Sequence, residues 1–248
     1  PLPPSSAASD VYKRQIFVSV IFLSLLGIVM VASVTIPLTD GSLSMALNHI
    51  LKLVVAFFVG LIVFRFSLEI WKTIDIGLIL FSFFLLTLVF IPFIGYEANG
   101  ASRWIRLFGF SFQPSELMKF SLIVYISSYC YRRMTEFKEK WIGFWKPVLV
   151  VVLAIALVLL EPDLGSSAVI FLISLTIMFI AGAPLKQMSI ILFMGSMVFV
   201  SMIILVPWRM QRILSFVDPW SAYGESGYQL SQALIAFSRG DLFGVGLG

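Results

Sequence analysis

The sequence predicts an all-α protein that crosses a membrane several times. Hydrophobic residues make up 60% of the chain and charged residues only 12%, whereas soluble domains carry about a quarter charged residues. Apolar runs long enough to cross a hydrocarbon layer about 30 Å thick, which takes about 20 helical residues, recur seven times along the 248 residues. These observations predict a polytopic membrane protein with seven transmembrane helices.

The seven predicted spans are separated by short polar segments. They cover residues 16–36, 50–66, 76–94, 114–131, 142–160, 167–183 and 188–206. The fifth is interrupted near its start by Lys146 and Pro147. Lys146 can extend its charge to the membrane surface, where Trp141 and Trp145 are typical anchors.

The distribution of Lys and Arg predicts the orientation, because cytoplasmic loops carry an excess of both. With the N-terminus inside, ten of these residues fall on the cytoplasmic side and six outside, and Lys119 lies within a span. The segment from Arg132 to Lys146 carries most of this excess. We therefore expect a cytoplasmic N-terminus.

The two ends differ in composition from the spans. Residues 1–15 begin with a low-complexity stretch of Pro, Ser and Ala, and we expect a non-native scar or a cytoplasmic tail there. Residues 207–248 are expected to be the start of a large outer loop, cut short in a chain that is an internal fragment. Within it, Gln229 to Phe237 is amphipathic and long enough to lie on a membrane surface but not to cross it.

The first candidate site is the pair Glu116 and Lys119, at the start of the fourth span. Side chains three residues apart on a helix lie on one face and can meet. Ionisable groups within a membrane are costly and usually face the interior of a bundle or an aqueous cavity. A buried ion pair that only fixes helix packing is the alternative, but we favour a functional cavity.

The second candidate is the segment from Asn99 to Arg106, which contains Arg103 and Trp104. Guanidinium groups suit phosphate oxygens, and Trp beside Arg suits a lipid headgroup region. An ordinary loop that meets phospholipid at the membrane surface is an equally good interpretation.

The third candidate is the short turn with Glu161, Pro162 and Asp163. Its two carboxylates could bind a cation or pair with the arginines of the second candidate. Locally, Pro162 would stop one helix and Asp163 would cap the next. Taken alone, this segment favours the local interpretation.

Other functional classes receive no support from the residues. One cysteine, Cys130, and one histidine, His49, exclude an intrachain disulfide and argue against a His/Cys metal site. No basic block accompanies a soluble fold, so we expect no nucleic-acid partner. A divalent cation stays open as a cofactor, and no metal ligand is assigned.

Four segments together resemble one membrane protein family. They are Asn99–Trp104, Gln113–Lys119, Glu161–Gly165 and Gly227–Gly248, and in this order they are similar to the SEDS proteins, the FtsW/RodA/SpoVE family, the last being most similar to septal members. The resemblance implies a ten-helix bundle in the bacterial inner membrane. It also implies a peptidoglycan glycosyltransferase that polymerises lipid II at the outer face during septal cell-wall synthesis. The implied partners are a class B penicillin-binding protein, divisome proteins and membrane lipids.

The resemblance also assigns roles to individual residues. Glu116, Lys119 and Asp163 match substrate-cavity residues of the family. Arg103 is a candidate contact for the pyrophosphate, on the basis of its charge and position. No catalytic residue is assigned, because the family's His-Thr-Asp-Phe segment is expected beyond Gly248, and the fragment is therefore expected to be inactive. A lipid II flippase and a non-catalytic divisome scaffold are the alternatives, and a generic seven-span receptor is disfavoured.

Overall fold

The chain forms two compact units in the computed structural model. One contains Pro1–Phe66 and Asp218–Gly248, and the other contains Ser67–Val217. The structure describes residues 6–38, 42–92, 94–98, 101–107, 110–221, 227–241 and 244–246. Six residues of two of the motifs lie outside these ranges: Asn99, Gly100, Leu242, Phe243, Leu247 and Gly248.

The first unit contains two long apolar helices. α1 (Ser6–Leu38) packs against α2 (Ser44–Arg65), and the Phe17 and Phe57 rings meet with 6.4 Å between their centroids. α1 already begins at Ser6, so part of the segment expected to be a tail continues the first helix. α10 (Tyr228–Gly240) coincides with the amphipathic stretch predicted from Gln229 to Phe237.

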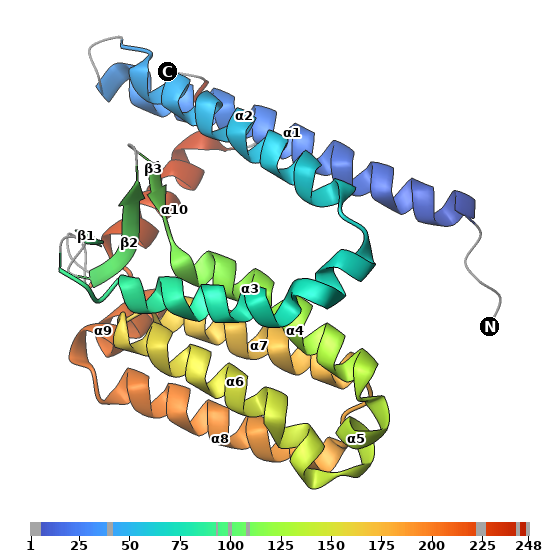
Figure 1. Cartoon of the computed structure of the whole chain (residues 1–248). Helices are drawn as coiled ribbons and strands as arrows, with labels where there is room; N and C mark the ends of the chain where they lie inside the picture. The colour runs from blue at the N-terminus through green and yellow to red at the C-terminus, as the bar shows by residue number, and fades with distance from the viewer. Residues whose placement is uncertain are drawn as a thin grey trace. The chain divides into compact units, whose positions relative to one another are not determined.

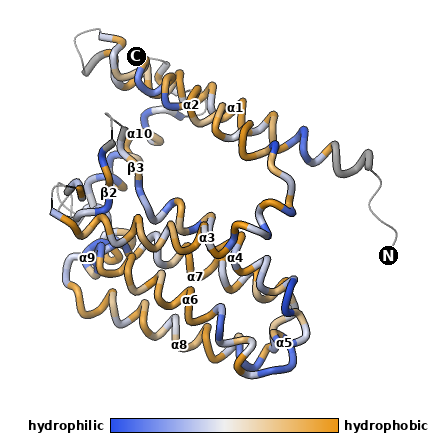
Figure 2. Tube along the Cα trace, viewed as in Figure 1, coloured by the Kyte–Doolittle hydropathy of each residue, from blue (hydrophilic) through white to orange (hydrophobic). Residues whose placement is uncertain are grey.

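The second unit is an antiparallel bundle (Figure 1). Its long helices are α3 (Leu68–Leu88), α4 (Pro114–Arg132), α6 (Trp141–Leu160), α7 (Leu164–Ile180) and α8 (Leu185–Ile204). The short helices α5 (Met134–Glu139) and α9 (Pro207–Val217) complete it. Figure 2 shows hydrophobic residues along α6, α7 and α8 and hydrophilic residues gathered around α5.

α4 is the central helix of this bundle. It contacts α3, α6 and α7 along its length, and its side chains Met118, Leu122 and Ile126 are fully buried. The hydroxyl groups of Ser121 on α4 and Ser82 on α3 share a buried hydrogen bond of 2.6 Å. The neighbouring helices bury Ser115, Ser121 and Ser128 of α4, whereas Glu116 and Arg132 near its two ends are exposed.

The central position of α4 explains why the number of spans differs from the prediction. Among the described residues, five helices are long and apolar enough to cross a membrane: Val11–Ile36, Ser44–Arg65, Leu68–Leu88, Trp141–Leu160 and Leu185–Ile204. α4 is too polar to be one of them, and α7 is apolar but has only 17 residues. The multi-pass architecture is confirmed, but length and composition do not confirm the number seven.

A small antiparallel sheet, absent from the all-α prediction, lies at one end of the bundle. Its strands β1 (Gly95–Ala98), β2 (Ala101–Leu107) and β3 (Phe110–Phe112) are ordered β1-β2-β3. Tyr96 pairs with Trp104, and the Arg106 guanidinium stacks on the Tyr96 ring at 3.6 Å. The third helix ends at Leu88 rather than continuing through residue 94, because the apolar residues that follow lead into this sheet. We call this end of the bundle the sheet end and the opposite one the α5 end.

Candidate functional site at the sheet end of the bundle

Three chain segments meet at the sheet end of the second unit. They are β2 with Arg103, the start of α4 with Gln113, and the α6–α7 turn with Glu161 and Asp163. The antiparallel course of α4, α6 and α7 brings the first residue of α4 beside the turn. Residues separated by about 60 positions along the chain thereby become neighbours.

Asp163 joins two helices. It caps α7, because its carboxylate accepts a hydrogen bond from the Ser166 main-chain N–H at 2.9 Å and another from the Ser166 hydroxyl at 2.8 Å. It also accepts from the Gln113 side-chain amide, which precedes the first turn of α4, at 3.2 Å. The local interpretation of Asp163 as a helix cap is therefore confirmed, and the same carboxylate also ties α7 to α4.

Arg103 fastens the sheet to the same turn. Its Nε donates to the carbonyl oxygen of Glu161 at 3.0 Å, and its Nη2 donates to that of Pro162 at 2.6 Å. The predicted pairing between this segment and the turn is present, but it uses main-chain carbonyl groups instead of carboxylates. The contact of Arg103 with a pyrophosphate stays a prediction.

Glu161, which the sequence analysis named in the third candidate but to which it assigned no role, is buried in the turn. Its side chain is 1% exposed, and neither carboxyl oxygen has a hydrogen-bond partner. Burial raises the pKa of this carboxyl to about 8, the nearby Asp163 charge raises it further, and Arg103 lowers it. Glu161 is thus mainly protonated at neutral pH. Its position directly after the apolar run that ends at Leu160 is the sequence signal that could have identified it.

Glu116 and Lys119 form the expected pair in the first turns of α4. The Lys119 Nζ lies 2.7 Å from the Glu116 Oε1, and the side chains are 19% and 58% exposed respectively. The alternative of an ion pair that only fixes helix packing required both side chains to be buried. They are not, because Glu116 faces outward while Lys119 lies against the bundle. Among the bonds of the described residues, none joins this pair to Asp163 or Arg103.

The binding of a divalent cation by the carboxylates of the turn stays a prediction. Both Asp163 oxygens already accept hydrogen bonds, and the positive Arg103 side chain lies against the same turn. In the described part of the chain, no three His, Cys, Asp or Glu side chains are grouped as a metal site would need.

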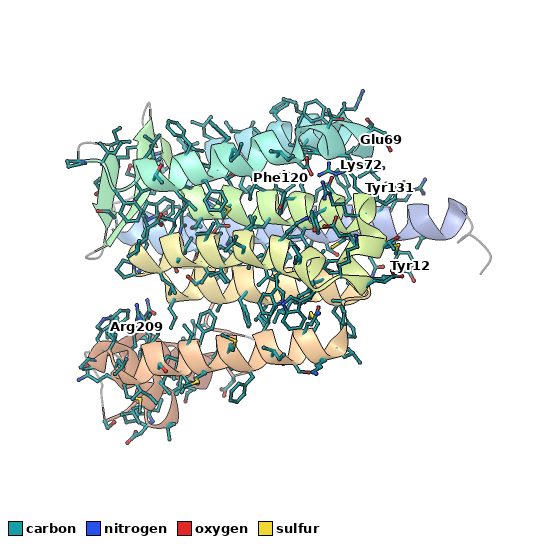
Figure 3. The ribbon with its side chains drawn as sticks, turned by 60° about the horizontal axis from the view of Figure 1, so that its bottom comes forward. Tyr12, Glu69, Lys72, Phe120, Tyr131 and Arg209 are labelled. Carbon is teal, nitrogen blue, oxygen red and sulfur yellow. The ribbon has the colours of Figure 1, made fainter. Side chains whose placement is uncertain are left out.

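A second charged cluster, which the sequence did not predict, lies at the α5 end. Arg132, in the last turn of α4, donates to the buried Asp75 of α3 at 2.6 Å. Nearby, Lys72 lies 4.3 Å from the centre of the Tyr131 ring and 2.8 Å from the Glu69 carboxylate. Figure 3 shows Glu69, Lys72 and Tyr131 gathered at this end. The position of Asp75 directly before the predicted third span is the only feature of the sequence that could have indicated this cluster.

The fold and the charged clusters define a multi-pass helical membrane protein with a polar site at one end of its bundle. The family model that matches residues 13–248 is FtsW/RodA/SpoVE, described as cell cycle protein. The chain belongs to this family.

The curated relatives carry the same family name. The chain is 38% identical over 247 residues to the probable peptidoglycan glycosyltransferase FtsW of Coxiella burnetii, covering 98% of this chain and 66% of that protein. It is 40% identical over 238 residues to the same-named protein of Saccharophagus degradans, covering 94% and 62%. The chain thus spans slightly less than two thirds of the length of these relatives.

Solved structures share the fold. A chain from a peptidoglycan synthase complex, studied for its coordination of polymerisation and crosslinking, matches with a TM-score of 0.66 at 26% identity, over 88% of this chain and 64% of that one. The rod shape determining protein RodA of Thermus thermophilus matches with a TM-score of 0.59 at 22% identity, over 88% and 69%. At that identity, the RodA match supports the fold alone.

Proposed function

We propose that the full-length protein is a peptidoglycan glycosyltransferase that polymerises lipid II into glycan strands. The observation that carries this proposal is the convergence of Arg103, Gln113, Glu161 and Asp163 at one end of the bundle, with Glu116 and Lys119 in the adjoining turns of α4. Family membership and the names of the relatives support the same activity.

The proposed chemistry is a glycosyl transfer with inversion. A carboxylate base would remove the proton from the acceptor hydroxyl while the polyprenyl pyrophosphate leaves. Positive groups close to the leaving group would stabilise its developing charge, and Arg103 and Lys119 are the candidates for this role. Glu116 is engaged by Lys119 at 2.7 Å, which makes it a poor choice as the base, and the base is not among the residues assigned here.

The proposed orientation places the sheet end on the outer face of the inner membrane. Within the second unit, seven Lys or Arg residues lie at or near the α5 end: Lys72, Arg132, Arg133, Lys138, Lys140, Lys146 and Lys186. Four lie at the sheet end, Arg103, Arg106, Arg209 and Arg212, and Lys119 lies in the adjoining turns of α4. Because cytoplasmic segments are enriched in these residues, the α5 end is assigned to the cytoplasm. We further assign the protein to the division septum, with a class B penicillin-binding protein and divisome proteins as partners.

The experiment that tests this function is polymerisation of lipid II by the full-length protein with its partner. Glu116→Gln keeps the shape of the side chain but removes the charge that Lys119 contacts, and a fall in turnover of at least about tenfold is expected. Glu139→Gln, which removes an exposed carboxylate at the α5 end, is the matched control and should leave turnover unchanged. Full activity of a normally folded Glu116→Gln protein would remove this pair from the site.

The same preparation separates the two competing functions. A lipid II flippase would move labelled lipid II across proteoliposome membranes without forming polymer. A non-catalytic scaffold would tolerate changes at both Glu116 and Asp163 while still recruiting the synthase. Either result in place of polymer would overturn the proposed activity.

A further inference from the structure

Arg103 binds the main chain at Glu161 and influences the charge of the Glu161 carboxyl group, but no hydrogen bond or ion pair joins the two side chains. Arg103 reaches the main-chain carbonyl of Glu161 itself, at 3.0 Å, and the next carbonyl along, at 2.6 Å. Both oxygens of the Glu161 side chain nevertheless have no hydrogen-bond partner, although the side chain is almost completely buried. A buried carboxylate without a partner is costly, and proteins normally avoid it by neutralising the group.

The choice of acceptors by Arg103 fits a neutral Glu161. A guanidinium and an ionised carboxylate form a strong pair that is frequently bidentate, with two parallel N–H···O bonds in which both partners are charged. An ionised Glu161 would therefore compete effectively for the two donors that Arg103 gives to the turn. The observed bonds to carbonyl groups are those expected while the carboxyl group is protonated.

Few other charges act on this carboxyl group. Among the described residues, Asp163 of the same turn and Arg103 of β2 are the charged groups that influence it. α4 contributes the uncharged Gln113 to the turn, and α7 contributes Ser166; both are engaged with Asp163. Asp163 already accepts hydrogen bonds from these donors, and Arg103 stays bonded to the carbonyl groups of Glu161 and Pro162.

We propose that Glu161 is a proton-dependent positioning residue for Arg103. While neutral, it leaves the guanidinium on the carbonyl groups of the turn, with its positive charge uncompensated by a carboxylate. When it ionises, its proton passes to solvent and the carboxylate captures Arg103 in an ion pair. The charge of Arg103 is then no longer available to an anionic ligand at the sheet end.

This inference rests on the proposed function in one respect, namely that Arg103 contacts the diphosphate of a polyprenyl substrate. Thermodynamic linkage then requires that protonation of Glu161 and binding of the diphosphate each favour the other. Protonation of Glu161 strengthens diphosphate binding, and a bound diphosphate, which engages Arg103, strengthens the hold of Glu161 on its proton. Binding above neutral pH is therefore accompanied by uptake of a proton from solvent.

The first test observes the carboxyl group directly. In the full-length protein, infrared difference spectra recorded between pH 6 and 10 should contain the C=O stretch of a protonated carboxylic acid, lost as the pH rises through about 8. Glu161→Gln should remove this band. Arg103→Met, which deletes the opposing charge, should move its loss to higher pH, whereas Arg106→Met on the same strand should not. Absence of the band near neutral pH, or the same titration in Arg103→Met, would overturn the proposal.

The second test measures binding of undecaprenyl diphosphate in detergent micelles. Between pH 7 and pH 9 the affinity of the wild type should fall about tenfold relative to Glu161→Gln, because a group that titrates near pH 8 loses about nine tenths of its protons over this interval. Titration of the ligand is common to both proteins and cancels in the ratio. Parallel pH profiles for the two proteins would contradict the proposed coupling.

The two tests can fail separately. If undecaprenyl diphosphate binds neither protein at any pH, the assigned ligand is wrong, and the infrared titration still decides whether Glu161 and Arg103 are coupled. If Glu161→Gln does not yield folded protein, the titration of the wild-type band and its displacement in Arg103→Met decide the question without that variant.

Discussion

Asp75 of α3 and Arg132 of α4 form an ion pair that joins the two helices at the α5 end of the bundle. The Asp75 carboxylate, 1% exposed on α3, accepts from the Arg132 Nη2 at 2.6 Å. The same guanidinium donates through Nη1 to the Lys72 carbonyl oxygen at 2.9 Å. One planar group thus holds both a side chain and the main chain of α3, and fixes the register of α3 against α4.

The first prediction concerns this fork. Arg132→Lys keeps the charge but cannot make both bonds in one plane, and Asp75→Asn removes the buried charge that Arg132 neutralises. Each substitution should lower the free energy of unfolding by about 1.5–3 kcal/mol, the usual contribution of a hydrogen bond to a charged group. Unfolding midpoints in detergent measure the effect. Glu69→Gln is the control, since the Glu69 side chain is 80% exposed and exposed pairs contribute about 0–1 kcal/mol.

The second prediction concerns the close approach of α5 and α6. A Cβ atom on Gly143 would collide with the main-chain carbonyl of Glu136, and the Gly143 carbonyl accepts a hydrogen bond from the buried Tyr129 hydroxyl at 2.8 Å. Gly143→Ala must therefore separate two backbones, and we expect a loss of about 1–3 kcal/mol, as in overpacked cores. Gly77→Ala on α3 is the matched control, because nothing lies within 4 Å of its added Cβ. The control should be neutral or stabilising, and equal loss in both variants would contradict this explanation.

Much of the architecture could be predicted from the sequence, because an apolar run that crosses the hydrocarbon layer must form a helix of about 20 residues. The predicted fourth span, 114–131, agrees with α4 (Pro114–Arg132), and the fifth, 142–160, agrees with α6. The prediction counted α4 as a span by its length, although its composition is too polar for a helix that crosses a membrane on hydropathy alone. The sheet was missed although Asn99-Gly100 is a strong hairpin signal, because the arginines and Trp104 were interpreted only as surface groups.

The candidate site was predicted less completely. The Glu116–Lys119 pair follows from helical spacing alone, and the cap formed by Asp163 follows from its place between two helices. The bonds of Arg103 to the α6–α7 turn join residues almost 60 positions apart, and no local pattern records such a contact. The burial of Glu161 also depends on the packing of the turn as a whole, which a single sequence does not reveal.

The third prediction separates the two roles of Asp163. Asp163→Ala removes the cap on α7 and the acceptor for Gln113, and should cost about 1 kcal/mol or more of stability. Asp163→Asn keeps an oxygen that can accept from the Ser166 N–H but loses the negative charge. Asp163→Asn loses the second oxygen, which accepts from Gln113 and the Ser166 hydroxyl, but keeps the cap, so it should be less destabilised than Asp163→Ala. If the charge serves the reaction, lipid II turnover of Asp163→Asn should fall at least about tenfold. Equal activity of the wild type and Asp163→Asn would restrict Asp163 to a structural role.

The fourth prediction is a pH dependence of stability that originates at Glu161. Folding raises the pKa of this carboxyl from an ordinary value of 4.5 to about 8. Below pH 4.5 the group is protonated in both the folded and the unfolded chain. Between pH 4.5 and about 8 only the unfolded chain loses the proton, so stability falls as the pH rises, by up to about 1.4 kcal/mol per pH unit. Above about pH 8 both states are ionised and this dependence ends.

Glu161→Gln carries no titrating group at this position and should lack the dependence. The difference in unfolding free energy between the wild type and Glu161→Gln, measured by denaturation in detergent from pH 5 to pH 9, isolates the contribution of Glu161, since all other groups titrate in both proteins. As the pH rises to about 8, the unfolding free energy of the wild type should fall relative to that of Glu161→Gln. Above about pH 8 the difference should be constant. A difference independent of pH would mean that the folded protein accommodates the ionised carboxylate as well as water does, and that burial does not hold the proton on Glu161.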